Sequence, residues 1–251
     1  MSRLWPDKSC AVLCPDQLQV VRPARGWRRR AAFGFSETLA GEGDGPPWQA
    51  AVAALERFLA TPGAGTGALD VVLSNHFVRY LLVPWSARIA SAEELRNYAA
   101  AMFEEIHGEG SAQWDVIVSA ERAGAPRLAA AVDRPLLESI RTTVAPTRMR
   151  LASIQPYLMA AYNRVARAHT GQDFVFMLLE TGRACIVAAQ GGRWCHVSTA
   201  AAPEPAQALA SLLARELRWP TCRGRRRRPS TSMPRTGRAW SCPRSSVRRR
   251  G

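Results

Sequence analysis

Apolar and polar residues follow two different periods along this chain. Short runs rich in valine, leucine and phenylalanine are typical of strands, and longer segments with apolar residues three and four positions apart are typical of helices. At the start of the chain these patterns predict three strands, a helix and a fourth strand, at 10–14, 17–22, 28–35, 48–60 and 69–73. Pro15-Asp16 separates the first two strands and is a turn signal, so these strands are expected to form a hairpin.

The middle of the chain begins with a run that is expected to contain two strands. Residues 70–85 are apolar on both sides of the polar Ser74-Asn75-His76. A helix over 91–107 is well specified, because Ser91 and Glu94 form a capping box ahead of an apolar stripe. Two strands, a helix and another strand are expected after it, at 114–119, 127–132, 133–144 and 149–153. Together these elements predict a small α/β unit.

The last apolar part of the chain repeats the order of the first. Pro156 suits the first turn of a helix that runs to about residue 169. Three strands and a further helix are expected after it, at 174–179, 184–189, 194–198 and 205–217. A three-strand meander followed by a helix thus occurs twice, although no sequence repeat is visible. We expect two related lobes, of which the second is incomplete because it lacks a later strand and helix.

Two segments carry a resemblance to a known family. The block 70–107, and residues 147–163 with the wording Thr147-Arg-Met-Arg-Leu-Ala-Ser-Ile-Gln-Pro-Tyr-Leu-Met-Ala-Ala-Tyr-Asn163, resemble the actin-like cytoplasmic proteins of type IV pilus and type II secretion assembly platforms (PilM-like proteins). The resemblance extends over roughly residues 8–217. It implies an α/β protein with actin-like (ribonuclease H-like) lobes. The expected division is a first lobe at 1–74, an α/β insert at 75–154 and a partial second lobe at 155–218.

The resemblance also implies a place and a partner. Members of this family are cytoplasmic and peripheral to the inner membrane, where they bind the short cytoplasmic tail of a single-span inner-membrane assembly protein. We therefore expect a docking or scaffold protein of a type IV pilus or type II secretion-like platform, without ATPase activity. The first alternative is a nucleotide-binding actin-like ATPase with a damaged C-terminus. The second alternative is a nucleic-acid-binding protein that acts through a basic tail.

The basic charge of the chain is concentrated after residue 218. Of 34 basic residues, 11 are arginines within 219–251, where no acidic residue occurs; this leaves 23 basic against 20 acidic residues, a net charge of +3 for the rest. Such a segment buries too little apolar surface to offset its ordering entropy, so a disordered Arg-rich tail is predicted. It reads as a basic arm or as an out-of-frame translation of a GC-rich gene. The second interpretation is favoured, because the tail stands where the second lobe still needs elements, and nucleic acid is not the expected partner.

Several other classes of protein lack support in the sequence. The first ten residues have charges but no apolar stretch typical of a secretory signal, and no run approaches the roughly 18 apolar residues that span a bilayer. The six cysteines lack CxxC spacing, and no Gly-x-Ser-x-Gly motif is present. No metal site and no catalytic residue is therefore expected.

The candidate nucleotide site consists of two hairpin turns, the places at which actin-like ATPases hold phosphates. Such turns approach phosphate with backbone N–H groups and supply a carboxylate to the metal. The first turn here contains Asp16 but no glycine, and Pro15 removes one N–H donor. The second turn contains Glu180 and Gly182 in an acid-x-glycine spacing. Asp16, Glu180 and Gly182 are thus the nucleotide-binding candidates, ATP is the one cofactor considered, and the site is expected to be degenerate.

The sequence does not identify a partner-binding site. Arg79 and Tyr80 could form a partner-binding edge on the strand before Pro84. The favoured interpretation is that Tyr80 packs within a sheet while Arg79 is solvated on the other face. Trp85 is expected to pack at the junction between the lobes.

Overall fold

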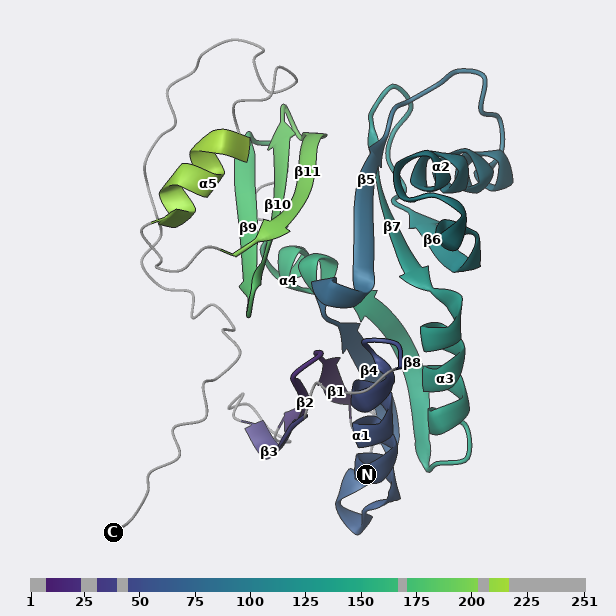
Figure 1. The fold of residues 1–251 in the computed structure, drawn as a ribbon, viewed down its shortest axis with the longest axis vertical. Coiled ribbons are helices and arrows are strands. Elements are labelled where there is room, and N and C mark those ends of the chain that lie inside the picture. The colour runs from purple at the N-terminus through teal and green to yellow at the C-terminus, as the bar shows by residue number, and fades with distance from the viewer. Residues whose placement is uncertain (1–7, 24–30, 40–44, 167–170, 203–207, 217–251) are drawn as a thin grey trace, which may run out of the picture.

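The computed structural model describes residues 8–23, 31–39, 45–166, 171–202 and 208–216, and arranges them around three β-sheets (Figure 1). Each strand and helix expected from the sequence has a counterpart among these residues, so the α/β class is confirmed. The predicted tail, 219–251, lies outside the described residues.

The first lobe is built on a mixed five-stranded sheet. In spatial order its strands are β3 (Ala31–Thr38), β2 (Gln17–Pro23), β1 (Lys8–Leu13), β4 (Gly67–Leu73) and β8 (Met149–Pro156). Strand β1 is antiparallel to β2 and parallel to β4, which is in turn parallel to β8. Helices α1 (Gln49–Ala60) and α3 (Arg134–Val144) lie side by side on this sheet (Figure 1). Their apolar faces and the sheet share one buried core.

Strand β8 and helix α3 belong to the first lobe, although the sequence placed both in the insert, 75–154. Leu69 of β4 lies opposite Leu151 of β8 in the parallel ladder, and Phe58 of α1 shares a core with Ile140 of α3. The expected boundary at 154 therefore falls inside a strand of the five-stranded sheet. Parallel neighbours are joined by long crossovers, and local periodicity carries no information about which distant strand a segment will pair with.

The insert is a three-stranded antiparallel sheet covered by one helix. Its strands, in order, are β5 (Val78–Val83), β7 (Arg127–Asp133) and β6 (Trp114–Val118), and the helix is α2 (Ala92–His107). The helix begins as expected: Glu94 N donates to Ser91 Oγ at 3.0 Å, and Glu94 Oε2 accepts from Ala90 N at 2.8 Å. Phe103 of α2 is fully buried against the sheet.

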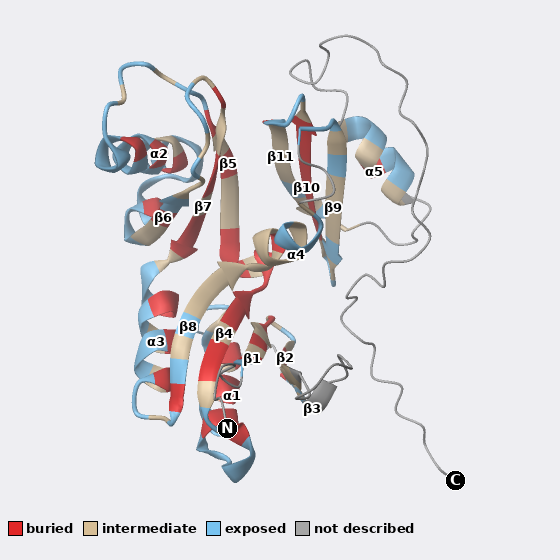
Figure 2. Cartoon of the chain, turned by 180° about the vertical axis from the view of Figure 1, so that it is seen from behind, coloured by how far each residue is buried: buried red, intermediate tan, exposed pale blue. Residues whose placement is uncertain are grey.

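The second lobe is an antiparallel meander in the order β11 (Arg193–Ala201), β10 (Arg183–Gln190) and β9 (Phe174–Glu180), with helices α4 (Tyr157–Val165) and α5 (Ala208–Glu216). The central strand β10 is buried along most of its length (Figure 2). One face of the sheet packs on α5 through Leu212, and the other packs on Leu158 of α4 and Leu128 of β7. Leu213 of α5 is only partly buried. The elements that the second lobe was expected to lack would come after Glu216, outside the described residues.

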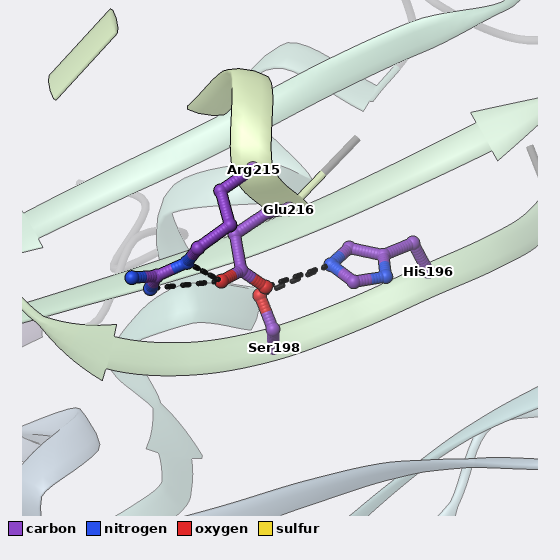
Figure 3. A network of polar contacts seen from close by, with 4 residues as sticks. All are labelled: His196, Ser198, Arg215 and Glu216. Atoms are coloured by element: carbon purple, nitrogen blue, oxygen red, sulfur yellow. Dashed lines mark hydrogen bonds and ion pairs between the residues drawn. The ribbon is translucent and has the colours of Figure 1, made fainter. Parts of the chain in front are cut away.

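A polar network holds the end of α5 on strand β11 (Figure 3). His196 Nε2 lies 3.0 Å from Ser198 Oγ and 3.6 Å from Glu216 Oε2, and Arg215 Nη2 lies 3.1 Å from Glu216 Oε1. Burial lowers the pKa of His196, and the nearby Glu216 carboxylate opposes this shift in part. Burial alone would raise the pKa of Glu216, but hydrogen bonds from Ser198 and Arg215 outweigh it and leave this pKa lowered.

Candidate functional site

The structure brings the two candidate turns together around a small cavity. One turn joins β1 to β2 and the other joins β9 to β10. The polar segment Ser74-Asn75-His76, here called the polar break, follows β4 and lies between them. The cavity has a volume of about 120 Å³. Its lining residues come from all three segments and are Cys14, Pro15, Asp16, Ser74, His76, Glu180 and Thr181. Asp16 and Glu180, far apart in sequence, thus reach one site.

Gly182, the third candidate, is not among the residues that line the cavity. Its φ is +71°, in the left-handed region that favours glycine in tight turns. A Cβ atom at this position would meet nothing within 4 Å. The conformation of the hairpin turn is therefore sufficient to explain why glycine stands at position 182, without any close approach of a phosphate.

The first turn uses its backbone within the first lobe. Cys14 N donates to Gln17 O at 2.9 Å, which closes the hairpin, and Asp16 O accepts from Leu39 N at 2.8 Å. Pro15 has no N–H group. These positions therefore contribute little to a cradle of backbone donors.

The second turn is hydrogen-bonded to Asn75 in the polar break. Glu180 Oε2 accepts hydrogen bonds from Asn75 N, at 3.0 Å, and from Asn75 Nδ2. Arg183 Nη1 donates to Asn75 O at 2.8 Å. Next to it, His76 Nε2 lies 3.0 Å from the carbonyl oxygen of Thr181. The turn between β9 and β10 is thus bound to the end of the first lobe by the side chains of Glu180 and Arg183 and by the backbone of Thr181.

Asn75 is fully buried, and its side chain reaches two further elements. Asn75 Oδ1 accepts from Tyr80 OH of β5 at 2.6 Å and from the backbone N of Leu158 in α4 at 3.2 Å. Burial raises the pKa of Tyr80 well above its usual value, with smaller contributions from Cys185 and Glu180, so this hydroxyl stays protonated as a donor. Sequence reasoning took Asn75 for part of a polar turn. The one signal that could have identified it is its position between two strongly apolar strands.

The charges around the cavity leave one carboxylate oxygen unsatisfied. Glu180 Oε1 is buried and has no hydrogen-bond partner among the residues that the structure describes. Asp16 lines the same cavity. In the part of the chain that is described, no three side chains of His, Cys, Asp or Glu are grouped so as to hold a metal ion. The site therefore has two acidic residues beside the cavity, while the N–H groups of Cys14, Asn75 and His76 donate to protein acceptors.

Of three other residues considered from the sequence, Tyr80 lies as expected, and Arg79 and Trp85 do not. Tyr80 packs between the cores of the first and second lobes, as favoured from the sequence. Arg79 is half-buried rather than fully solvated. It donates to the carbonyl oxygens of His76 and Val78, and its pKa is lowered by burial and by nearby Arg183. Trp85 is 45% exposed and lines a separate cavity of about 200 Å³ beside the start of α2, so the expectation of a lobe-junction residue is wrong.

The order of elements in the two lobes defines the actin-like fold. Each lobe contains a three-strand meander followed by a helix, an α/β insert interrupts the first lobe, and the turns of the two meanders meet at the central cavity. The comparison with solved structures confirms this fold class.

Three solved structures illustrate the likeness. The cytoplasmic domain of EpsL, an inner-membrane component of the type II secretion system of Vibrio cholerae, matches with a TM-score of 0.55 and 12% identity, over 83% of this chain and 75% of that chain. A chain of the PilM–PilN type IV pilus biogenesis complex matches with a TM-score of 0.56 and 13% identity, over 86% and 67%. A Bacteroides thetaiotaomicron protein of unknown function with an actin-like ATPase fold matches with a TM-score of 0.54 and 8% identity, over 83% and 75%.

The sequence comparisons are negative. No protein-family model matches the chain, and no curated protein is similar to it in sequence. The likeness to the three solved structures therefore concerns the fold. Among the described residues, no helix is both long and apolar enough to cross a membrane.

Proposed function

We propose that this chain is a docking component of a type II secretion or type IV pilus assembly platform and that it does not hydrolyse ATP. The fold it shares with the EpsL cytoplasmic domain and with a chain of the PilM–PilN complex supports the assembly role. The observation that supports the absence of ATP hydrolysis concerns Glu180, the acidic residue of the second turn. Its carboxylate accepts hydrogen bonds from the backbone and side chain of Asn75.

The composition of the cavity supports a site without nucleotide. A phosphate placed between the turns would lie close to the acidic residues Asp16 and Glu180, and like charges at close range repel. Phosphate-binding turns offset this repulsion with backbone N–H donors and a metal ion. Here Pro15 supplies no N–H, and the N–H of Cys14 closes its own hairpin. Asn75 already occupies Oε2 of Glu180, so a metal ion could use this oxygen only by displacing Asn75, and the other oxygen, Oε1, is buried.

The partner that we propose is the short cytoplasmic tail of a single-span inner-membrane assembly protein. This assignment places the chain in the cytoplasm, against the inner membrane. The described architecture supports it by offering complete sheets in the first lobe and the insert, and we propose that these two units carry the docking surface. The Arg-rich segment 219–251 has no part in this proposal.

A titration tests the docking proposal. The full chain is titrated with the tail peptide, a synthetic peptide that corresponds to the cytoplasmic tail of a candidate single-span inner-membrane assembly protein. We expect saturable binding at one site, and we expect Asp16→Asn to bind the peptide with unchanged affinity. If the tail peptide does not bind, while the chain remains folded by circular dichroism, the docking role is wrong.

A turnover assay tests the second half of the proposal. The chain is compared with a double variant, Asp16→Asn with Glu180→Gln, which removes both carboxylates that a magnesium-bound nucleotide would need. We expect no ATP turnover from either protein. Turnover by the parent chain that disappears in the double variant would establish an actin-like ATPase instead.

A further inference from the structure

We propose that Asn75 and the β9–β10 turn form a clasp that holds the two lobes closed over the central cavity. The clasp consists of Asn75, Glu180, Thr181 and Arg183, together with His76. It goes beyond the docking role, because it assigns a conformational function to residues that neither partner binding nor catalysis uses.

The turn holds Asn75 at both ends of its backbone. Glu180 and Arg183 are directly paired across the β9–β10 ladder, so they leave the turn side by side. The carboxylate of Glu180 accepts the N–H of Asn75, and the guanidinium of Arg183 donates to its carbonyl oxygen at 2.8 Å. Both hydrogen bonds involve a charged side chain, and such bonds are about twice as strong as neutral ones.

The side chain of Asn75 carries the connection to the rest of the molecule. Its Nδ2 binds Glu180 in the second lobe, while its Oδ1 accepts from Tyr80 in the insert and from Leu158 N at the start of α4. One fully buried residue thus joins the end of β4, strand β5, helix α4 and the β9–β10 turn. Separation of the lobes must break the bonds of Asn75 to the second lobe, those with Glu180, Arg183 and Leu158, and each buried group released would lose its partner.

Cys14 offers a direct readout of opening. It lines the cavity between the turns and is 5% exposed, so a thiol reagent reaches it only when the lobes separate. Cys185 is 0% exposed in the core of the second lobe and reports on unfolding of that lobe. Burial raises the pKa of Cys185 to about 11, which keeps it slow to react while the lobe stays folded. Neither cysteine is in a disulfide.

The test measures iodoacetamide labelling of the full chain, with each cysteine followed separately by peptide mass spectrometry. Glu180→Gln keeps the shape of the side chain but removes its charge. We expect Cys14 to be labelled about tenfold faster in this variant, the effect of losing one charge-assisted hydrogen bond, with Cys185 unchanged. Glu138→Gln removes an exposed carboxylate from α3 and serves as the matched control, with wild-type rates at both cysteines.

A second variant tests whether faster labelling of Cys14 comes from opening of the clasp rather than from a local change at Glu180. Arg183→Gln removes the other charged contact to Asn75 and should also accelerate labelling of Cys14 alone. Wild-type rates at Cys14 in both variants would overturn the clasp, as would a parallel rise at Cys14 and Cys185. This experiment uses no partner and no nucleotide, so its result does not depend on whether the docking proposal is right.

Discussion

The stability of the chain should depend strongly on one buried asparagine, Asn75. The change Asn75→Ala removes three side-chain hydrogen bonds, those with Glu180, Tyr80 and Leu158 N. It leaves two partners unpaired in the interior, the Tyr80 hydroxyl and the Leu158 N–H, because Glu180 keeps its bond to the backbone N of residue 75. An unsatisfied buried polar group costs about 1–3 kcal/mol. For two such groups we therefore expect a loss of about 2–6 kcal/mol, a large part of the roughly 5–15 kcal/mol by which native proteins are stable.

Urea unfolding followed by tryptophan fluorescence and circular dichroism measures this loss. Tyr80→Phe removes only one donor and leaves Asn75 Oδ1 bound to Leu158 N, so we expect it to cost about 0.5–1.5 kcal/mol. Asn97→Ala, at an exposed position of α2, is the matched control and should stay within about 0.5 kcal/mol of the parent. A cost for Asn75→Ala as small as that of the control would refute the central position of this residue.

Three further changes test separate parts of the structure. Phe103→Ala empties a fully buried position and should cost about 3–5 kcal/mol in urea unfolding, whereas Leu213→Ala, at a partly buried position, should cost less than about 2 kcal/mol; equal losses would contradict the observed packing. Because the pKa of His196 is lowered on folding, the unfolded chain takes up this proton first, so stability should fall as the pH drops below 6.5, and His196→Gln should flatten this part of the profile in thermal melts. Gly182→Ala places a Cβ at φ +71° in open space and should cost about 1 kcal/mol without changing peptide binding; a loss of binding would show a functional role for Gly182.

Local signals in the sequence were sufficient for the individual elements. The capping box at Ser91 and Glu94 marks the start of α2, and the strands of both meanders follow their apolar runs. Asp16 and Glu180 were expected in comparable hairpin turns, and both line one cavity, whereas nucleotide binding at these residues stays a prediction. These inferences succeed because caps and turns depend on residues close together in the chain.

Long-range contacts could not be read from local pattern. Nothing in the segment around Leu151 indicates that it pairs with β4 rather than with the insert. Asn75 looked like an ordinary turn residue, because its acceptor, Glu180, lies in another lobe. Arg79 and Trp85 differ from expectation because the solvent exposure of a side chain depends on tertiary packing: Arg183 and Asp133, both distant in sequence, lie near Arg79, whereas Trp85 stays 45% exposed.

The central claim is that the chain docks a partner without using nucleotide. A calorimetric titration with the tail peptide, run without nucleotide and again with millimolar MgATP, tests this most directly. We predict the same affinity and stoichiometry in both runs. Binding that appears or strengthens only with MgATP, and that loses this dependence in the Asp16→Asn, Glu180→Gln double variant, would contradict the account.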